Sequence, residues 1–127
     1  MSVKKILLVD DAGSLLLLEQ AVLQSAAGYQ ILAAKDGEAG VRAALAHRPG
    51  LILLDADPPG MIAAEVCRQL RAHEATRAIP ILLLAPRGTA ASKKNVDRGF
   101  PSGCEGCIIK PIDHNELLSK VRSLLGD

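Results

Sequence analysis

Aromatic residues are nearly absent from this sequence: Tyr29 and Phe100 are the only two, and there is no tryptophan. The chain therefore lacks the aromatic platform on which nucleic-acid bases stack. It also lacks an excess of positive charge, because 15 basic side chains are balanced by 14 acidic ones, for a formal net charge of +1. We therefore expect no nucleic-acid partner and no electrostatic attraction to an anionic membrane.

Long hydrophobic runs are missing as well. The first apolar run covers only residues 6–9, which is too short for a signal peptide or a transmembrane helix. A chain of 127 residues is the size of one domain with its own hydrophobic core. We predict a single domain over residues 1–127, without an effector domain. We expect it in the cytoplasm, where its three cysteines would stay reduced.

Short apolar runs alternate with segments of helical length. The runs are continuous, which is typical of strands buried on both faces of a parallel sheet. They cover residues 6–9, 31–34, 51–54, 81–84 and 107–109. The segments between them predict helices over 14–27, 37–47, 62–73, 89–98 and 113–125, with Asp113 as the N-cap of the last. Five such repeats indicate an α/β fold, a doubly wound five-stranded parallel sheet with helices on both faces.

Charged residues gather at the carboxyl ends of the predicted strands. They are Asp10, Asp11, Asp55, Asp57 and Lys110. Doubly wound sheets place their sites at this edge, so we interpret these residues as one functional cluster. Carboxylate oxygens suit a hard cation such as Mg²⁺. A carboxylate beside Mg²⁺ and a lysine is suited to nucleophilic attack on phosphorus, because both cations neutralise charge on the phosphoryl group.

These residues make the whole chain resemble the response-regulator receiver domain of two-component signalling. The matching segments are LLVDDAGSL, RPGLILLDADPPGM, IPILLLA and CIIKPI. The resemblance implies a flavodoxin-like receiver fold and a signalling domain rather than an enzyme. It also implies a histidine kinase or a histidine phosphotransfer protein as the phosphoryl donor, and an effector protein as a further partner.

The resemblance also implies a role for each matching residue. Asp55 would be the phosphoacceptor. Mg²⁺ would be bound by Asp11 directly, by Asp10 mainly through water, by Asp55, and by the backbone carbonyl of Asp57. Lys110 would contact the phosphoryl oxygens.

Two switch positions depart from the family's pattern. Ala85 stands where the family has a Thr or Ser whose hydroxyl bonds the phosphoryl group. Cys107 stands where an aromatic residue usually swings inward on activation. These departures leave open an alternative function, a pseudo-receiver that acts as a protein-interaction module and signals without phosphorylation.

Cys104 and Cys107 form a C-x-x-C, the spacing of a thiol redox site or of half a zinc site. A redox C-x-x-C works best at a helix N-terminus, whereas this one leads into a predicted buried strand, where cysteine behaves as a small hydrophobic residue. No second pair of zinc ligands is visible. We therefore interpret both residues as packing residues and assign Cys67 to the core. A thiol redox role through Cys104 and Cys107 is the disfavoured alternative.

Overall fold

Parallel strands form one sheet in the part of the chain that the computed structural model describes, which is residues 4–10, 28–55, 62–85, 104–109 and 113–126. The strands are β1 (Lys5–Val9), β2 (Gln30–Ala34), β3 (Leu51–Asp55), β4 (Ile81–Ala85) and β5 (Gly106–Ile109). Their order across the sheet is β2-β1-β3-β4-β5, and every neighbouring pair is parallel. This is the order of the flavodoxin-like doubly wound fold, so the predicted fold class is confirmed.

The apolar runs form the strands that the sequence predicts, but their burial depends on their place in the sheet. All residues of β3 and β4 are buried, as are the last four of β1. The edge strand β2 buries only Ala34 fully, and β5 alternates between buried and half-buried residues. The prediction that every run is buried on both faces is therefore wrong for the two edge strands. An edge strand has a neighbour on one side only, so more of its surface meets water.

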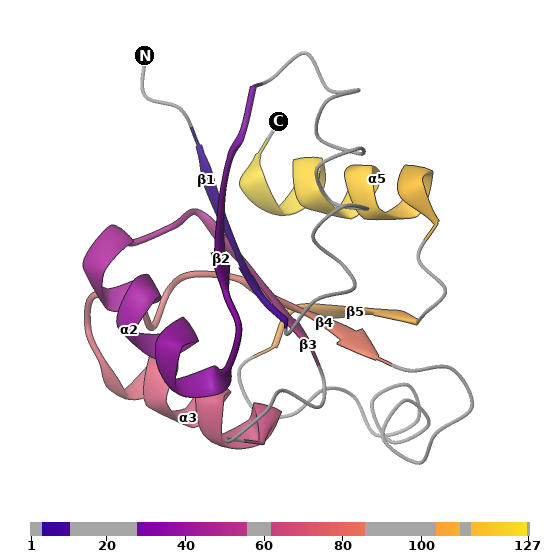
Figure 1. The fold of residues 1–127 in the computed structure, drawn as a ribbon. Helices are drawn as coiled ribbons and strands as arrows, with labels where there is room; N and C mark the ends of the chain where they lie inside the picture. The colour runs from indigo at the N-terminus through magenta and orange to yellow at the C-terminus, as the bar shows by residue number, and fades with distance from the viewer. Residues whose placement is uncertain (1–3, 11–27, 56–61, 86–103, 110–112, 127) are drawn as a thin grey trace.

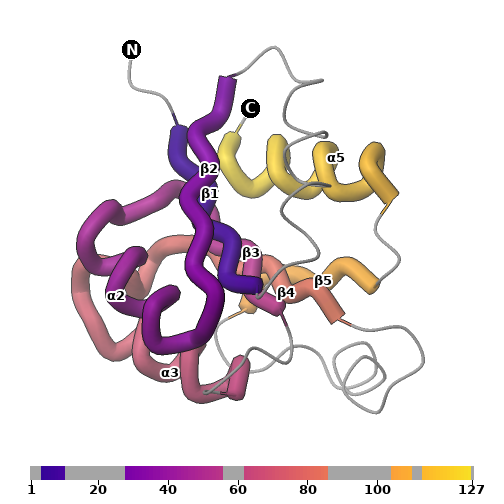
Figure 2. Tube along the Cα trace, in the orientation of Figure 1, coloured from indigo at the N-terminus to yellow at the C-terminus, as the bar shows by residue number. Residues whose placement is uncertain are grey.

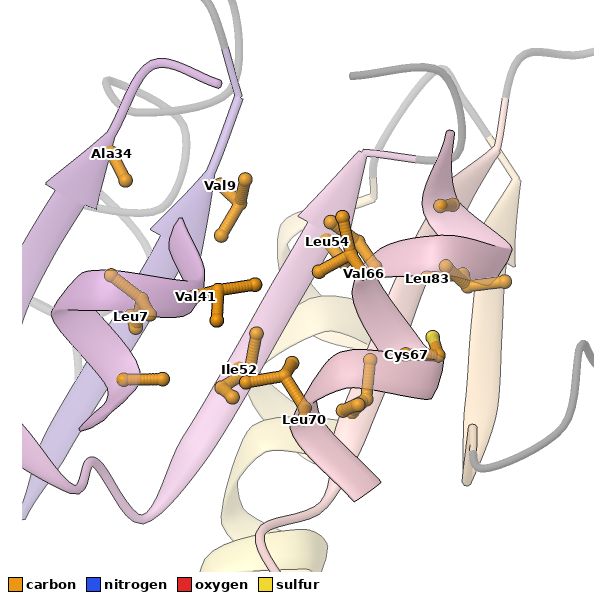
Figure 3. Packing of buried hydrophobic residues seen from close by; sticks show 13 residues of the cluster. Leu7, Val9, Ala34, Val41, Ile52, Leu54, Val66, Cys67, Leu70 and Leu83 are labelled. Atoms are coloured by element: carbon orange, nitrogen blue, oxygen red, sulfur yellow. The ribbon is translucent and has the colours of Figure 1, made fainter. Parts of the chain in front are cut away.

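Helices cover both faces of the sheet (Figures 1 and 2). They are α2 (Gly37–His47), α3 (Ala63–Ala72) and α5 (His114–Leu125). One core cluster joins α5 to the sheet through Leu117 and Val121. A second cluster joins α2 and α3 to the opposite face, with Val41, Val66 and Cys67 among its members (Figure 3). The predicted helices over 14–27 and 89–98 lie outside the described residues.

Local signals set the ends of these helices. The Asp113 side chain accepts hydrogen bonds from the backbone N–H groups of Asn115 and Glu116, so its predicted role as N-cap is confirmed. Asp36 caps α2 in the same way, accepting from the Ala39 N–H at 2.8 Å. The helix predicted over 62–73 is shorter by one residue at each end, because Ile62 and His73 are its extended flanking residues.

Candidate functional site

The chain reverses its winding direction between β1 and β3. From β1 it first adds β2 on one side of the sheet and then returns to add β3 on the other. In doubly wound folds, the crevice at such a switch point, outside the carboxyl ends of the strands, is where ligands bind. Asp10 follows β1 directly and Asp55 is the last residue of β3, so both stand at this point.

The strand register brings these two acids level. Val9 pairs with Leu54 across β1 and β3, so Asp10 and Asp55 are the next residues on two adjacent strands. Neighbouring strands are about 4.8 Å apart. The Asp10 backbone N–H donates to the Ala34 carbonyl oxygen at 3.0 Å, which holds this end of β1 against β2. The sheet itself therefore positions both carboxylates at one edge.

Both carboxylates are largely withdrawn from solvent. Asp10 is 8% exposed and Asp55 is 9% exposed, and they rank with Thr76 as the buried polar or charged residues of the described segments. Each of these side chains offers two carboxylate oxygens at the end of its strand. Oxygen donors are also the ligands that Mg²⁺ prefers. The donor set therefore fits a hard divalent cation.

The neighbouring strand β4 brings one of the two switch positions, Ala85, to the same edge. Asp55 pairs with Leu84, so Ala85 lies one residue further along β4. Ala85 is fully buried and, having only a methyl group, offers no hydroxyl. It pairs with Ile109, the last residue of β5, which Lys110 follows in the sequence.

Cys107 lies two residues before the end of β5, where it pairs with Leu83. It is half-buried against the second core cluster, which includes residues of α3. Burial raises the pKa of the Cys107 thiol, as expected for a cysteine that behaves as a small hydrophobic residue. The interpretation of Cys107 as a packing residue agrees with this placement.

Three predicted site residues, Asp11, Asp57 and Lys110, lie outside the described residues. The described segments by themselves bring no three His, Cys, Asp or Glu side chains together as a metal site. The structure thus places Asp10, Asp55, Ala85 and Cys107 relative to the sheet. The roles of all seven residues stay predictions.

A group of residues that sequence reasoning missed lies between α3 and the start of β5. The Cys67 and Cys104 sulfur atoms are 3.2 Å apart. Next to them, Arg71 forms an ion pair with Glu105 at 3.1 Å. Cys67 was correctly assigned to the core, but its contact with Cys104 joins positions 37 residues apart. The C-x-x-C spacing links Cys104 with Cys107 instead, and no local spacing in the sequence points to Cys67.

Comparisons with known proteins agree with this architecture. The family model described as "Response regulator receiver domain" matches residues 6–122. The DNA-binding dual master transcriptional regulator RpaA of Synechocystis is 37% identical over 121 residues, which is 95% of this chain and 48% of that protein. The response regulator PleD of Caulobacter vibrioides is 38% identical over 122 residues, 94% of this chain and 26% of that protein. The chain therefore spans half or less of the length of these relatives.

Solved structures show the same fold. The receiver domain of a sensor histidine kinase from Pseudomonas aeruginosa, with a magnesium ion coordinated in its active site cleft, superposes with a TM-score of 0.80. It is 28% identical, and the match covers 99% of this chain and 100% of that one. The chemotaxis response regulator CheY4 of Vibrio cholerae also has a TM-score of 0.80, with 27% identity, and the match covers 97% of this chain and 99% of that one. Sequence and structure together establish that this chain belongs to the family of response regulator receiver domains.

Proposed function

We propose that this receiver domain accepts a phosphoryl group on Asp55 from a phosphohistidine of a histidine kinase or a histidine phosphotransfer protein. The observation that carries the proposal is the position of the Asp55 carboxylate, at the end of β3, level with Asp10 and at the switch point of the sheet. The opposite edge of the sheet carries no comparable pair of acids among the residues described.

In this proposal Asp55 is the nucleophile. One of its carboxylate oxygens forms a bond to phosphorus, and the bond between phosphorus and the histidine nitrogen breaks. Asp10, Asp11, Asp55 and the backbone carbonyl of Asp57 would hold Mg²⁺, which neutralises charge on the phosphoryl oxygens when it is bound. Lys110 follows β5 at the same edge and would contact those oxygens. The rigid sheet keeps the Asp55 carboxylate in place for attack, so little reorganisation is needed.

The first experiment is phosphorylation of the purified chain by acetyl phosphate with Mg²⁺, read by intact mass. We expect addition of one phosphoryl group to the native chain and none to the Asp55→Asn variant. The amide keeps the volume of the side chain but removes the nucleophile. Glu74→Gln is the matched control, because it removes an exposed carboxylate from the segment between α3 and β4, which enters the sheet at the edge opposite the site. It should be labelled like the native chain.

The same assay tests the metal requirement. Adding a chelator should abolish labelling, since the charge on the transferring group is then no longer neutralised. Labelling of the Asp55→Asn variant, or equal labelling with the chelator present, would contradict the proposal.

A pseudo-receiver that signals without phosphate is the second candidate. The observation in its favour is that Ala85, buried at the site edge, and Cys107, half-buried against the core, lack the side chains that the family uses as switches. A folded native chain that takes up no phosphoryl group would support this candidate.

A domain arrangement of one receiver unit over 1–127, an effector protein as partner and a location in the cytoplasm belong to the proposal as well. No helix among the described residues is long and apolar enough to cross a membrane.

A further inference from the structure

Two cysteines from distant parts of the chain meet beside the α3 helix. The Cys67 sulfur lies 3.2 Å from the Cys104 sulfur, a contact that either thiol could make as the hydrogen-bond donor. Cys67 is on α3, fully buried in the second core cluster (Figure 3). Cys104 is half-buried and lies two residues before β5. Both thiols are free, and the pair combines a buried residue with a half-buried one.

The residues next to the two cysteines tie the same two segments together. Arg71, one helical turn after Cys67, donates from Nη2 to the Glu105 carboxylate at 3.1 Å. Its Nη1 donates to the carbonyl oxygens of Arg77 and Ile79 at 2.7 and 2.6 Å. Glu105, next to Cys104, also accepts from the Ile81 backbone N–H at 2.6 Å. These bonds fix the segment before β5 against α3, so the two sulfur atoms are held in one another's reach.

The shared proton affects the two thiols in opposite ways. The hydrogen bond from Cys104 lowers the pKa of Cys67. The same hydrogen bond, together with burial, raises the pKa of Cys104 far above its ordinary range. The pair therefore loses its first proton more readily than its second, and the remaining proton is shared between the sulfur atoms. A thiolate is the species that attacks disulfides.

We propose that Cys67 and Cys104 are a redox-active pair, which low-molecular-weight disulfides such as glutathione disulfide convert reversibly into an intramolecular disulfide linking α3 to the start of β5. An S–S bond is about 2 Å long, so sulfur atoms at 3.2 Å need only a small further approach. This function is separate from phosphoryl transfer and does not depend on it.

The exchange balances without another reactant. The pair first gives one proton to water. Cys104, the half-buried residue of the two, then attacks the small disulfide from the less populated form in which the shared proton lies on Cys67. A mixed disulfide forms, and one small thiolate leaves and takes up the proton from Cys67. The Cys67 thiolate then attacks the Cys104 sulfur, the new S–S bond forms, and the second small thiolate leaves. Two electrons pass from the protein pair to the small disulfide, which becomes two small thiol molecules, and an excess of these reverses the reaction.

The pair differs from the C-x-x-C that the sequence suggests. Cys107 lies within β5, paired with Leu83, and its pKa is raised by burial. No hydrogen bond joins it to Cys104 among the bonds found in the described residues. We therefore expect Cys107 to remain a free thiol when the pair is oxidised.

The test is oxidation of the native chain in a glutathione redox buffer. The reaction is quenched with acid, free thiols are alkylated with N-ethylmaleimide, and the products are read by intact mass and by mapping of linked peptides. We expect the native chain to lose two of its three alkylatable thiols, with Cys67 linked to Cys104, and to regain them with dithiothreitol. Cys107→Ser is the matched control and should form the same link. Cys104→Ser should keep both remaining thiols free.

Four results of this experiment would overturn the proposal. A link between Cys104 and Cys107, three free thiols in the native chain, or a glutathione adduct on Cys104 that does not resolve would each overturn the proposal. So would a Cys67–Cys104 link that forms only in guanidinium chloride, where the fold no longer guides pairing. Cys67→Ala should also abolish the link. If that buried substitution prevents folding, the half-buried Cys104→Ser variant is used instead, after circular dichroism has shown that it is folded.

Discussion

In the proposed function, Ala85 removes one contact through which phosphorylation could act on this domain. It ends β4 fully buried and level with the last residue of β5. A hydroxyl at this position would donate a hydrogen bond to the phosphoryl group, and hydrogen bonds to charged groups contribute roughly 1.5–3 kcal/mol. That free energy would shift a two-state equilibrium by one to two orders of magnitude, about tenfold for each 1.4 kcal/mol. Without it, a bound phosphoryl group loses one of its contacts that differ between states.

We predict that a beryllofluoride mimic of the phosphoryl group changes backbone amide shifts near Asp10 and Asp55 but not across the rest of the sheet. The Ala85→Ser variant should extend the shifts along β4 and β5, because the added hydroxyl restores a contact that depends on the ligand. Amide spectra with and without the mimic measure both effects. Large concerted shifts in β5 of the native chain would mean that this receiver switches by another route.

Close packing between elements depends on one glycine in α2. A Cβ atom added at Gly40 would lie 2.7 Å from Cγ2 of Val9, and Val9 immediately precedes Asp10. Valine is stiff at χ1, so it cannot rotate away easily. Gly40 therefore sets how closely α2 approaches β1 at the end of the sheet where the candidate site lies.

The Gly40→Ala variant should unfold more easily than the native chain, by about 1 kcal/mol. Alanine gains up to about 1 kcal/mol of helix propensity, but overpacking a filled core costs about 1–3 kcal/mol. In a Val9→Ala background the clash is removed, so the same Gly40→Ala change should become stabilising. Urea denaturation of the four chains in this cycle measures the coupling. Equal effects of Gly40→Ala in both backgrounds would rule out the steric explanation.

The molecule as a whole is organised around three central strands. Among the described strands, β1, β3 and β4 each have a hydrogen-bonded strand on both sides, whereas β2 and β5 have one on a single side. Large apolar side chains from the central strands, among them Leu7, Leu53 and Leu83, are fully buried. Opening of the structure at an edge breaks fewer contacts than opening at the centre, so stability should fall from the centre outwards.

Native-state hydrogen exchange should follow this order. We expect the slowest backbone amides in β1, β3 and β4, and faster exchange in β2 and β5. If the Cys67–Cys104 disulfide forms, amides near the start of β5 should slow, because the link ties that segment to α3. Exchange in the edge strands of the reduced chain as slow as in β3 would contradict the expected order.

Much of the fold follows from local features of the sequence. The runs at residues 51–54 and 81–84 are continuous and apolar, and a strand buried on both faces needs that composition. Helix α2 begins and ends at the residues predicted, and Asp113 caps α5 as expected. The burial of β2 could not be predicted in the same way. Its apolar run looks like that of a central strand, and only the strand order places it at an edge.

The candidate site was also predictable only in part from the sequence. That acids follow the first and third strands is visible in the sequence, and parallel strands bring their carboxyl ends to one edge. That Asp10 and Asp55 are level, buried and on adjacent strands is a matter of register and strand order. The residues predicted as their companions, Asp11, Asp57 and Lys110, lie outside the described residues, so their places stay predictions.

The sequence by itself determined the class of fold, the N-cap at Asp113 and the family, because those depend on hydrophobic runs, on hydrogen bonds between near neighbours and on short motifs. Tertiary structure alone decided which cysteine meets which. Cys104 is three residues from Cys107 in the sequence, yet its sulfur lies against that of Cys67, 37 residues away. The physical reason is that the packing of α3 and β4 beside β5, reinforced by the Arg71–Glu105 ion pair, brings the two segments together. The spacing of residues along the chain does not predict such a contact.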